Sequence, residues 1–372
     1  MARTAQEFGD WPLKRLMTEV VGSGPKSADD MSREQAREAL QRIFAGEPEE
    51  TTLGAFWLAN RWKRNTPEEL AGYTDVMREE SVITAEPECD PVDCGANYDG
   101  KHTSALLGVG AGVVAAAAGT PVVVHSGDGV PTQKETAYKH VLDELGVRID
   151  LEPEESADMV DETGFGFYYQ PAFNPAIDDL YDRRDEMGVR TFINTIETVA
   201  NPANADVHLG SFYHLAFAKK LTSLIQDSAE LEYSRAIFFQ GMEGYDDIRP
   251  GYTKVAEWND SEARSASDDA SGDEPRAGDD LEDFEIETAD YGMEMDSDDL
   301  AVDDVRSDSA AITETVLAGD RDDHFADAIA LNAAFRIYAR DDVSDLETGL
   351  ERARTVIDDG SAAAVLEDLR AF

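Results

Sequence analysis

The chain has 372 residues, of which 42% are hydrophobic, and it carries 79 acidic residues against 32 lysines and arginines, for a formal net charge of −47. A chain of this length and apolar content can bury a sizeable core, which excludes a disordered acidic protein for most of its length. The charge is typical of a protein kept soluble in a salt-rich cytoplasm, because salt screens self-repulsion, and it weighs against a broad nucleic-acid-binding face.

The sequence also indicates the compartment. Cys89 and Cys94 are the only cysteines, too few for a zinc cluster or a disulfide framework. The first residues lack the apolar core of a signal peptide. Residues 105–124 are uncharged, but Thr120-Pro121 interrupts them, which favours a packed helix and a strand over a membrane span. We therefore expect a cytoplasmic protein with no membrane partner.

Residues 1–85 are predicted to form a helical domain. Ser32 and Gln35 have the spacing of a capping box, and Thr66 is an N-cap followed by Pro67 at the first helical position. A further helix is expected between them. Its bulky apolar face predicts burial against a second domain or a second subunit, and both alternatives remain open.

Residues 86–372 are predicted to form an α/β domain. Helical patterns alternate with short apolar runs, which favours a mainly parallel sheet. The expected strands lie at 122–124, 165–169, 191–194 and 236–239.

Two glycine-bearing loops flank the strand at 122–124. They span 90–104 and 126–136, and each leads into a helix with Ser or Thr at its start. Backbone N–H groups at helix N-termini bind anions, and glycine allows their close approach. The pattern predicts a phosphate-bearing ligand between these loops.

A helix led in by Asn174-Pro175 and ended by Gly188 carries Arg183 and Arg184. Guanidinium groups match carboxylates and phosphates, so both are candidate clamps for a ligand. The alternative is ion pairing with acidic residues of the same helix, which is the commoner use of helical arginines.

Asp246 and Asp247 lie in a glycine loop just after the strand at 236–239. Ligand crevices of open α/β sheets lie at the carboxyl ends of strands, and Mg²⁺ is held by one or two carboxylates plus substrate phosphates. The pair is therefore a candidate magnesium site. Residues 261–283 form a polar, acidic insertion expected to be a solvated loop, and helices follow it.

The chain resembles the anthranilate phosphoribosyltransferase family, glycosyltransferase family 3, which also includes the pyrimidine nucleoside phosphorylases. The resemblance rests on segments 53–72, 122–125, 145–147, 188–191, 201–203, 244–248, 328–334 and 358–362. It implies a small N-terminal helical domain, joined by a helical part of about 174–226, and a large mainly parallel α/β domain that binds phosphoribosyl diphosphate. It also implies a homodimer built through the helical domain.

The resemblance further implies roles for single residues. Asp246 and Asp247 match the pair that binds Mg²⁺ with the donor, and Arg184 matches the arginine that holds the aromatic acid's carboxylate. Asn174 stands where the family often has histidine, and His125 matches a histidine of the family's Lys-His-Gly-Asn-Arg loop. Residues 95–103, beginning at Gly95, occupy the place of the diphosphate loop.

Three departures point to the family's divergent branch, whose members keep the fold and often lack the activity. The diphosphate loop has fewer glycines, and Val124 replaces the lysine before His125. Glu197-Thr198 replaces Gly-Pro in the acceptor site. A glutamate there would repel a carboxylate-bearing acceptor.

The first hypothesis is a Mg²⁺-dependent phosphoribosyltransferase acting on an aromatic amine such as anthranilate or a related acceptor, a step in tryptophan biosynthesis. Positioning and electrostatic stabilisation of the departing diphosphate would supply the catalysis. The expected diphosphate-binding residues are Asn97, Lys101, Thr103, Ser104 and Lys134. The alternative is a non-catalytic relative that binds nucleotides or nucleic acid, and a nucleoside phosphorylase ranks third.

Overall fold

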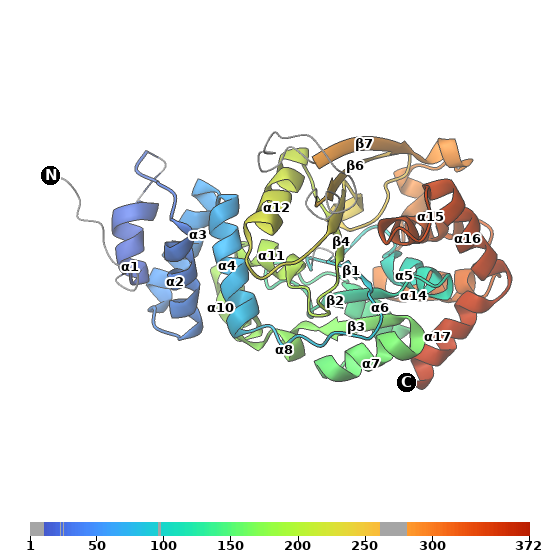
Figure 1. The fold of residues 1–372 in the computed structure, drawn as a ribbon, viewed down its shortest axis with the longest axis horizontal. Coiled ribbons are helices and arrows are strands. Elements are labelled where there is room, and N and C mark those ends of the chain that lie inside the picture. Colours follow the sequence, from blue (N-terminus) through green and yellow to red (C-terminus); the bar gives the residue numbers. More distant parts are fainter. Residues whose placement is uncertain (1–10, 23, 25, 96–97, 261–280) are drawn as a thin grey trace, which may run out of the picture.

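The computed structural model describes residues 11–22, 24, 26–95, 98–260 and 281–372. A lobe of N-terminal helices stands at one end, a twisted sheet crosses the middle, and the C-terminal helices lie at the other end (Figure 1). The predicted α/β class with an N-terminal helical domain is confirmed. The exact division at residue 85 stays a prediction.

The helical lobe contains the short helices α1 and η1 and three longer helices. Their bounds are α1 Leu13–Leu16, η1 Met17–Val21, α2 Arg33–Phe44, α3 Glu50–Lys63 and α4 Pro67–Glu80. Both predicted capping boxes form: the Ser32 side chain accepts from the Gln35 N–H, and the Thr66 side chain accepts from the Glu69 N–H. Each box fixes a helix start within the lobe.

The described strands form one seven-stranded sheet in the order β3-β2-β1-β4-β5-β6-β7. The first five run parallel, and β6 and β7 add an antiparallel edge. Their bounds are β1 Val92–Cys94, β2 Val122–Ser126, β3 Phe165–Tyr169, β4 Val207–Ser211, β5 Arg235–Phe239, β6 Tyr252–Asn259 and β7 Leu281–Glu287. Most of the predicted insertion, residues 261–280, lies outside the described residues.

One predicted strand is wrong, and four of the seven described strands (β1, β4, β6 and β7) were not predicted. Residues 191–194 lead into the helix α11 (Ile193–Ile196), because the Thr191 N–H donates to Asn194 Oδ1 over 2.8 Å and the Ile193 N–H donates to Thr191 Oγ1 over 3.2 Å. These local side-chain bonds compete with a strand ladder. Val92–Cys94, expected as loop, is instead the interior strand β1, which pairs with β2 and β4.

The sheet separates two apolar cores, and its side chains alternate between them. Val122 and Val124 belong to one core, whereas Val123, between them, belongs to the other. The first core is closed by α5, α6, α7 and the C-terminal helices: α5 Gly108–Ala117, α6 Tyr138–Glu144, α7 Pro153–Thr163, α14 Val305–Leu317, α15 His324–Ala339, α16 Leu346–Asp358 and α17 Ser361–Ala371.

The second core joins the other face of the sheet to the helical lobe. It includes side chains from the segment 173–233, whose helix α12 packs on α4. The helices here are α8 Gln170–Phe173, α9 Pro175–Asp178, α10 Tyr181–Met187, α11, η2 Glu197–Val199 and α12 Leu215–Asp227, and short 3-10 turns follow at η3 Met242–Gly244, η4 Thr288–Tyr291 and η5 Ser297–Leu300. The range 174–226, expected to be helical, thus also contains β4.

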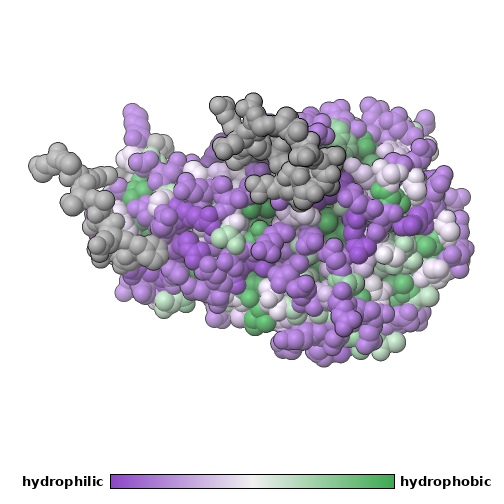
Figure 2. Space-filling model, viewed as in Figure 1, coloured by the Kyte–Doolittle hydropathy of each residue, from purple (hydrophilic) through white to green (hydrophobic). Residues whose placement is uncertain are grey.

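The surface is dominated by polar side chains. Figure 2 shows a face on which hydrophilic residues cover most of both lobes and apolar residues appear only in small separate areas. Among the described residues, none of the helices is both long enough and apolar enough to cross a bilayer. Cys89 and Cys94 are both free thiols, and Cys94 is buried in β1.

Candidate active site

The two predicted glycine loops lie side by side at the carboxyl ends of β1 and β2. Lys101 and Thr136 form an antiparallel bridge, with N–H to O distances of 2.9 and 3.2 Å. Gly100 has φ +85°, and a Cβ there would lie 2.6 Å from the carbonyl carbon of Glu135. Glycine therefore allows this contact between the loops.

The first loop binds a carboxylate of its own chain. Glu243, in η3 after β5, accepts five hydrogen bonds from the backbone and hydroxyl groups of His102, Thr103 and Ser104. The shortest come from the Ser104 hydroxyl at 2.6 Å and the Ser104 N–H at 2.8 Å. Burial alone would raise the pKa of Glu243, but the hydrogen bonds from the loop have the larger effect and lower that pKa to about 2. The loop thus binds one anionic group, the Glu243 carboxylate, through its backbone and hydroxyl donors.

Asp246 and Asp247 lie beside this loop, and all four of their carboxylate oxygens already accept hydrogen bonds. Asp246 Oδ1 accepts from the Tyr138 hydroxyl, and Oδ2 accepts from the Arg336 guanidinium over 3.0 Å. Asp247 Oδ2 pairs with the Lys101 ammonium, and Oδ1 accepts from the Met242 N–H over 3.0 Å. Burial raises the pKa of both carboxyls, and Arg336 and Lys101 oppose that rise.

The aspartate pair, in this arrangement, does not fit a magnesium ion. The metal needs free carboxylate oxygens, and here two cations of the chain neutralise the pair. Across the described part of the chain, no group of three or more His, Cys, Asp or Glu side chains could hold a metal. The predicted magnesium ligands are therefore the anions of two buried ion pairs.

Arg184 is likewise occupied by a partner of the chain. Its two terminal nitrogens donate to the two carboxylate oxygens of Glu197 over 3.1 and 3.0 Å, and both side chains are buried. Gln170 Nε2 also donates to Glu197, over 3.2 Å. Arg184 therefore does not pair within its own helix, and it is not available as a clamp for a ligand's carboxylate.

Asn174 lies nearby, between α8 and α9, and is fully buried. Its Oδ1 accepts a hydrogen bond from the Ser81 hydroxyl over 2.6 Å, which ties α9 to the end of α4. Its Nδ2 has no hydrogen-bond partner among the described residues. The Asn174 side chain thus bonds to the end of the helical lobe, through Ser81.

His125, near the end of β2, belongs to a buried polar chain that spans three strands. Tyr98 bonds its Nδ1, and its Nε2 lies 3.2 Å from Asp93 Oδ1. The other oxygen of Asp93 lies 2.7 Å from His208 Nδ1 and accepts from the Tyr233 hydroxyl over 2.9 Å. One carboxylate in β1 therefore serves an imidazole in β2 and another in β4.

A cavity of about 300 Å³ opens beside these groups, at the carboxyl ends of β1 and β4. It is lined by both lobes, with Gly95, His208, Gly210, Phe212 and Phe217 among its walls. Arg61 and Arg190 also line it, and Arg190 pairs with Asp99. An aromatic, partly apolar wall with a few polar groups is typical of a small-molecule site.

The remaining predicted site residues do not all lie together. Gly95 lines the cavity, and Lys101, Thr103 and Ser104 lie in the anion loop. Lys134 is exposed and pairs with Asp185 of α10 over 3.2 Å, away from the aspartate pair. Asn97 lies outside the described residues.

Three residues at the site were missed by the sequence analysis. Glu243 lies in the same glycine loop as Asp246 and Asp247, just after a strand, so the rule that selected the two aspartates also applied to it. Asp93 and His208 had no such signal, because β1 and β4 were not predicted.

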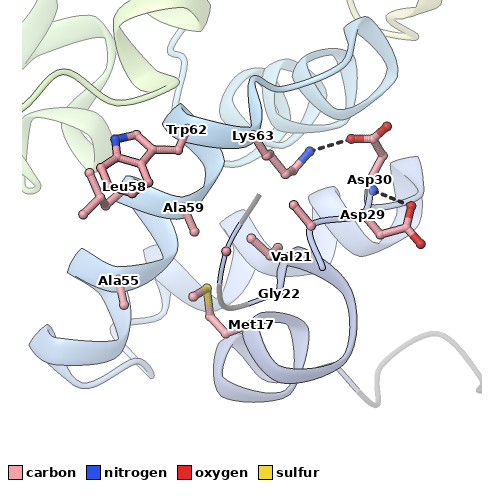
Figure 3. A pocket seen from close by; sticks show the side chains of 12 residues that line it. Met17, Val21, Gly22, Asp29, Asp30, Ala55, Leu58, Ala59, Trp62 and Lys63 are labelled. Carbon is pink, nitrogen blue, oxygen red and sulfur yellow. Dashed lines mark hydrogen bonds and ion pairs between the residues drawn. The ribbon is translucent and has the colours of Figure 1, made fainter. Parts of the chain in front are cut away.

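A second cavity, of about 560 Å³, lies within the helical lobe, between η1 and α3 (Figure 3). Met17, Val21 and Ala59 form its apolar wall, and Leu58 and Trp62 stand at its rim. The Trp62 side chain is 72% exposed, an unusual place for an indole.

The chain thus combines a helical lobe, a mainly parallel sheet, a loop that binds a carboxylate and an adjoining cavity. A family model described as "Glycosyl transferase family, a/b domain" matches residues 93–363, and one described as "Glycosyl transferase family, helical bundle domain" matches residues 19–81.

Curated relatives agree with these matches. Anthranilate phosphoribosyltransferase of Methanocorpusculum labreanum is 34% identical over 92% of this chain and 94% of its own. The enzyme of Haloferax volcanii is 30% identical over 92% of this chain and 96% of its own. The solved enzyme of Thermus thermophilus has a TM-score of 0.75 at 25% identity, covering 92% and 96% of the two chains.

The chain belongs to this glycosyl transferase family, that of the anthranilate phosphoribosyltransferases, as the sequence segments predicted. Its class is therefore that of a phosphoribosyltransferase. A yeast anthranilate phosphoribosyltransferase "in complex with PRPP and Mg" shares the fold, with a TM-score of 0.73 at 18% identity over 92% of this chain and 93% of its own.

Proposed function

We propose that the protein transfers ribose 5-phosphate from phosphoribosyl diphosphate to an aromatic amine, with anthranilate or a related compound as acceptor. The observation that carries this proposal is the convergence of the His102, Thr103 and Ser104 donors on one carboxylate. Such a cradle holds an anion through fixed N–H dipoles, and the donor's diphosphate would replace Glu243 there. The same donors then stabilise the diphosphate as it leaves.

The 300 Å³ cavity takes the acceptor. It adjoins the cradle, because Gly244, which follows Glu243, lines it together with Gly95 at the end of β1. Phe212 and Phe217 offer apolar contact to an aromatic ring. Since Glu197 already occupies Arg184, a carboxylate on the acceptor would be held by Arg61 or Arg190 instead.

Magnesium remains a prediction for this chain. A yeast relative's structure contains it, but Asp246 and Asp247 here are paired with Arg336 and Lys101. We therefore assign no step to a metal on these carboxylates. Lys101 lies in the loop itself, and its ammonium is paired with Asp247.

The proposal extends to the assembly and the compartment. The proposal includes a homodimer built through the helical lobe and a cytoplasmic location. The apolar cavity of that lobe, with Leu58 and the exposed Trp62 at its rim, is a surface that a second copy would cover (Figure 3).

The test is turnover by the full chain at high salt, followed by the loss of anthranilate fluorescence on addition of phosphoribosyl diphosphate, with and without Mg²⁺. Aniline serves as the acceptor without a carboxylate. Ser104→Ala removes the hydroxyl nearest Glu243 and should weaken donor binding about tenfold, since a hydrogen bond to a charged group contributes roughly 1.5–3 kcal/mol. Ser307→Ala, at an exposed position of α14, is the matched control.

One observation favours a second function. The cradle and both aspartates are fully engaged by the chain's own side chains, as expected of a relative that keeps the fold without turnover and binds nucleotides or nucleic acid. The absence of calorimetric binding by phosphoribosyl diphosphate, together with saturable binding of an oligonucleotide, would replace the transferase proposal by this one.

A further inference from the structure

His208 has the surroundings of a proton acceptor. One of its ring nitrogens, Nδ1, is bonded to the buried carboxylate of Asp93. The ring lies in β4 at 1% exposure, with Nδ1 2.7 Å from Asp93 Oδ2. Burial alone would raise the pKa of Asp93, but His125 and His208 hold that pKa below its usual range. Asp93 is therefore a carboxylate, and it favours the tautomer whose proton sits on Nδ1, leaving the Nε2 lone pair open.

The opposite edge of the imidazole, formed by Cε1 and Nε2, faces the cavity. A Cβ on Gly95 would lie 2.6 Å from His208 Cε1, and a Cβ on Gly210 would lie 2.9 Å from His208 Nε2. Both glycines and His208 line the 300 Å³ cavity. Glycine at these two positions therefore keeps side chains off the Cε1–Nε2 edge of the imidazole.

We propose that His208 Nε2 accepts the proton that the acceptor nitrogen loses in the transfer, with Asp93 as a positioning residue. This inference rests on the proposed function and deepens it. The bond from the amine nitrogen to C1 of the ribose forms, and the C1–oxygen bond breaks, so the diphosphate leaves with the electron pair. The proton of the N–H goes to Nε2, and no group is oxidised or reduced.

The ring's neighbours suit this role. Tyr233 donates to the same oxygen of Asp93 and lies 5.1 Å from the His208 ring, so the carboxylate stays oriented when the imidazole becomes charged. Phe238 contacts the other side of the ring at 5.8 Å. Asp93 would stabilise the imidazolium, the second half of a general base's task. The titratable and charged groups on the Asp93 side of the ring are Asp93, Tyr233, His125 (across Asp93) and Arg78 (which interacts with Asp93 and Tyr233). Those that line the cavity with His208 are Arg61, Arg190, Tyr213 and His214.

The decisive comparison is His208→Asn against His324→Asn, a partly exposed histidine at the start of α15 that does not line the cavity. We expect His208→Asn to lower kcat about 10²- to 10³-fold with KM for the amine changed less than about threefold, because the base acts only in the transition state. The acid limb of the wild-type kcat–pH profile should vanish in this variant. An unchanged kcat, or a loss confined to KM, would overturn the role.

His208→Ala gives a second readout, because imidazole added to the solution has room in the enlarged cavity. Partial recovery of kcat by imidazole supports the role, and no recovery in a folded variant contradicts it.

A measurement on the wild type keeps the test independent of variant folding and of turnover. Aniline is titrated while the ¹⁵N signal of His208 Nε2 is recorded. A saturable shift of this signal, absent at His324, is expected if the amine reaches the ring. If the Nε2 signal does not shift, the proposed role of His208 is wrong, even if turnover is found. A shift without any turnover would instead count against the proposed transfer reaction alone.

Discussion

An anionic ligand of the loop at 102–104 would compete with Glu243 for the same N–H groups. Substituting Glu243 therefore tests whether these groups bind an anionic ligand. In Glu243→Gln the negative charge is lost while the shape is kept. The affinity for inorganic diphosphate should rise about tenfold, because a neutral amide is a weaker acceptor than a carboxylate whose bonds each contribute roughly 1.5–3 kcal/mol. Calorimetric titration at high salt gives the value.

Glu282→Gln makes the same change of charge at an exposed position of the edge strand β7 and should leave diphosphate affinity unchanged. A drop in affinity on Glu243→Gln, or an equal rise in both variants, would mean that Glu243 does not occupy the ligand's place.

The ion pairs of Asp246 and Asp247 make a prediction about metal binding. Wild-type protein without donor should show no saturable Mn²⁺ binding that depends on these carboxylates, since their four oxygens are engaged by Tyr138, Arg336, Lys101 and the Met242 N–H. The measurement is electron paramagnetic resonance of Mn²⁺ in molar KCl, which distinguishes free from protein-bound Mn²⁺. A Mn²⁺ site that Asp247→Asn removes would show that Lys101 yields its place to a metal.

At the scale of the elements, α4 is joined to its neighbours by one buried acid. Glu69 accepts from the Met31 N–H over 2.8 Å and from Lys63 Nζ over 2.6 Å, and it also closes the Thr66 capping box. Glu69→Ala removes the buried partner of Lys63 on α3 and leaves that ammonium paired with Asp30, whose side chain is largely exposed. The free energy of unfolding should fall by about 3–5 kcal/mol, as measured by denaturant titration.

The exposed neighbour provides the reference for this measurement. Glu68→Ala, in the same first turn of α4, should change stability by about 0.5 kcal/mol or less. If the two variants lose similar stability, the buried network around Glu69 contributes little to the lobe.

The elements also show what the sequence can predict. The runs at β2 and β3 and the two capping boxes carry local signals, a buried apolar run and a cap three residues from its partner, and these were predicted correctly. Val92–Cys94 has only three residues, one of them a buried aspartate, so its pattern resembles a loop. Lys101 and Asp247 lie 146 positions apart, and no local pattern reveals such a pair.

At the scale of the whole molecule, the net charge of −47 sets the conditions under which the fold is stable. The surface in Figure 2 is largely hydrophilic, and repulsion among its carboxylates opposes the compact state. Raising KCl from about 0.1 to 1 M shortens the screening length from about 10 to 3 Å. The Tm measured by circular dichroism should therefore rise steadily with KCl, whereas a flat or falling Tm would contradict the proposed adaptation to salt.

The shared carboxylate of Asp93 has a consequence for every experiment on this sheet. Because one negative charge faces His125 in β2 and His208 in β4, the two imidazoles are electrostatically coupled through it. A substitution of His125 in β2 would therefore also change the electrostatic surroundings of His208 in β4. Variants of His125 and His208 therefore need to be combined in a double-mutant cycle. The cycle separates the direct effect of each substitution from the interaction of the two histidines through Asp93.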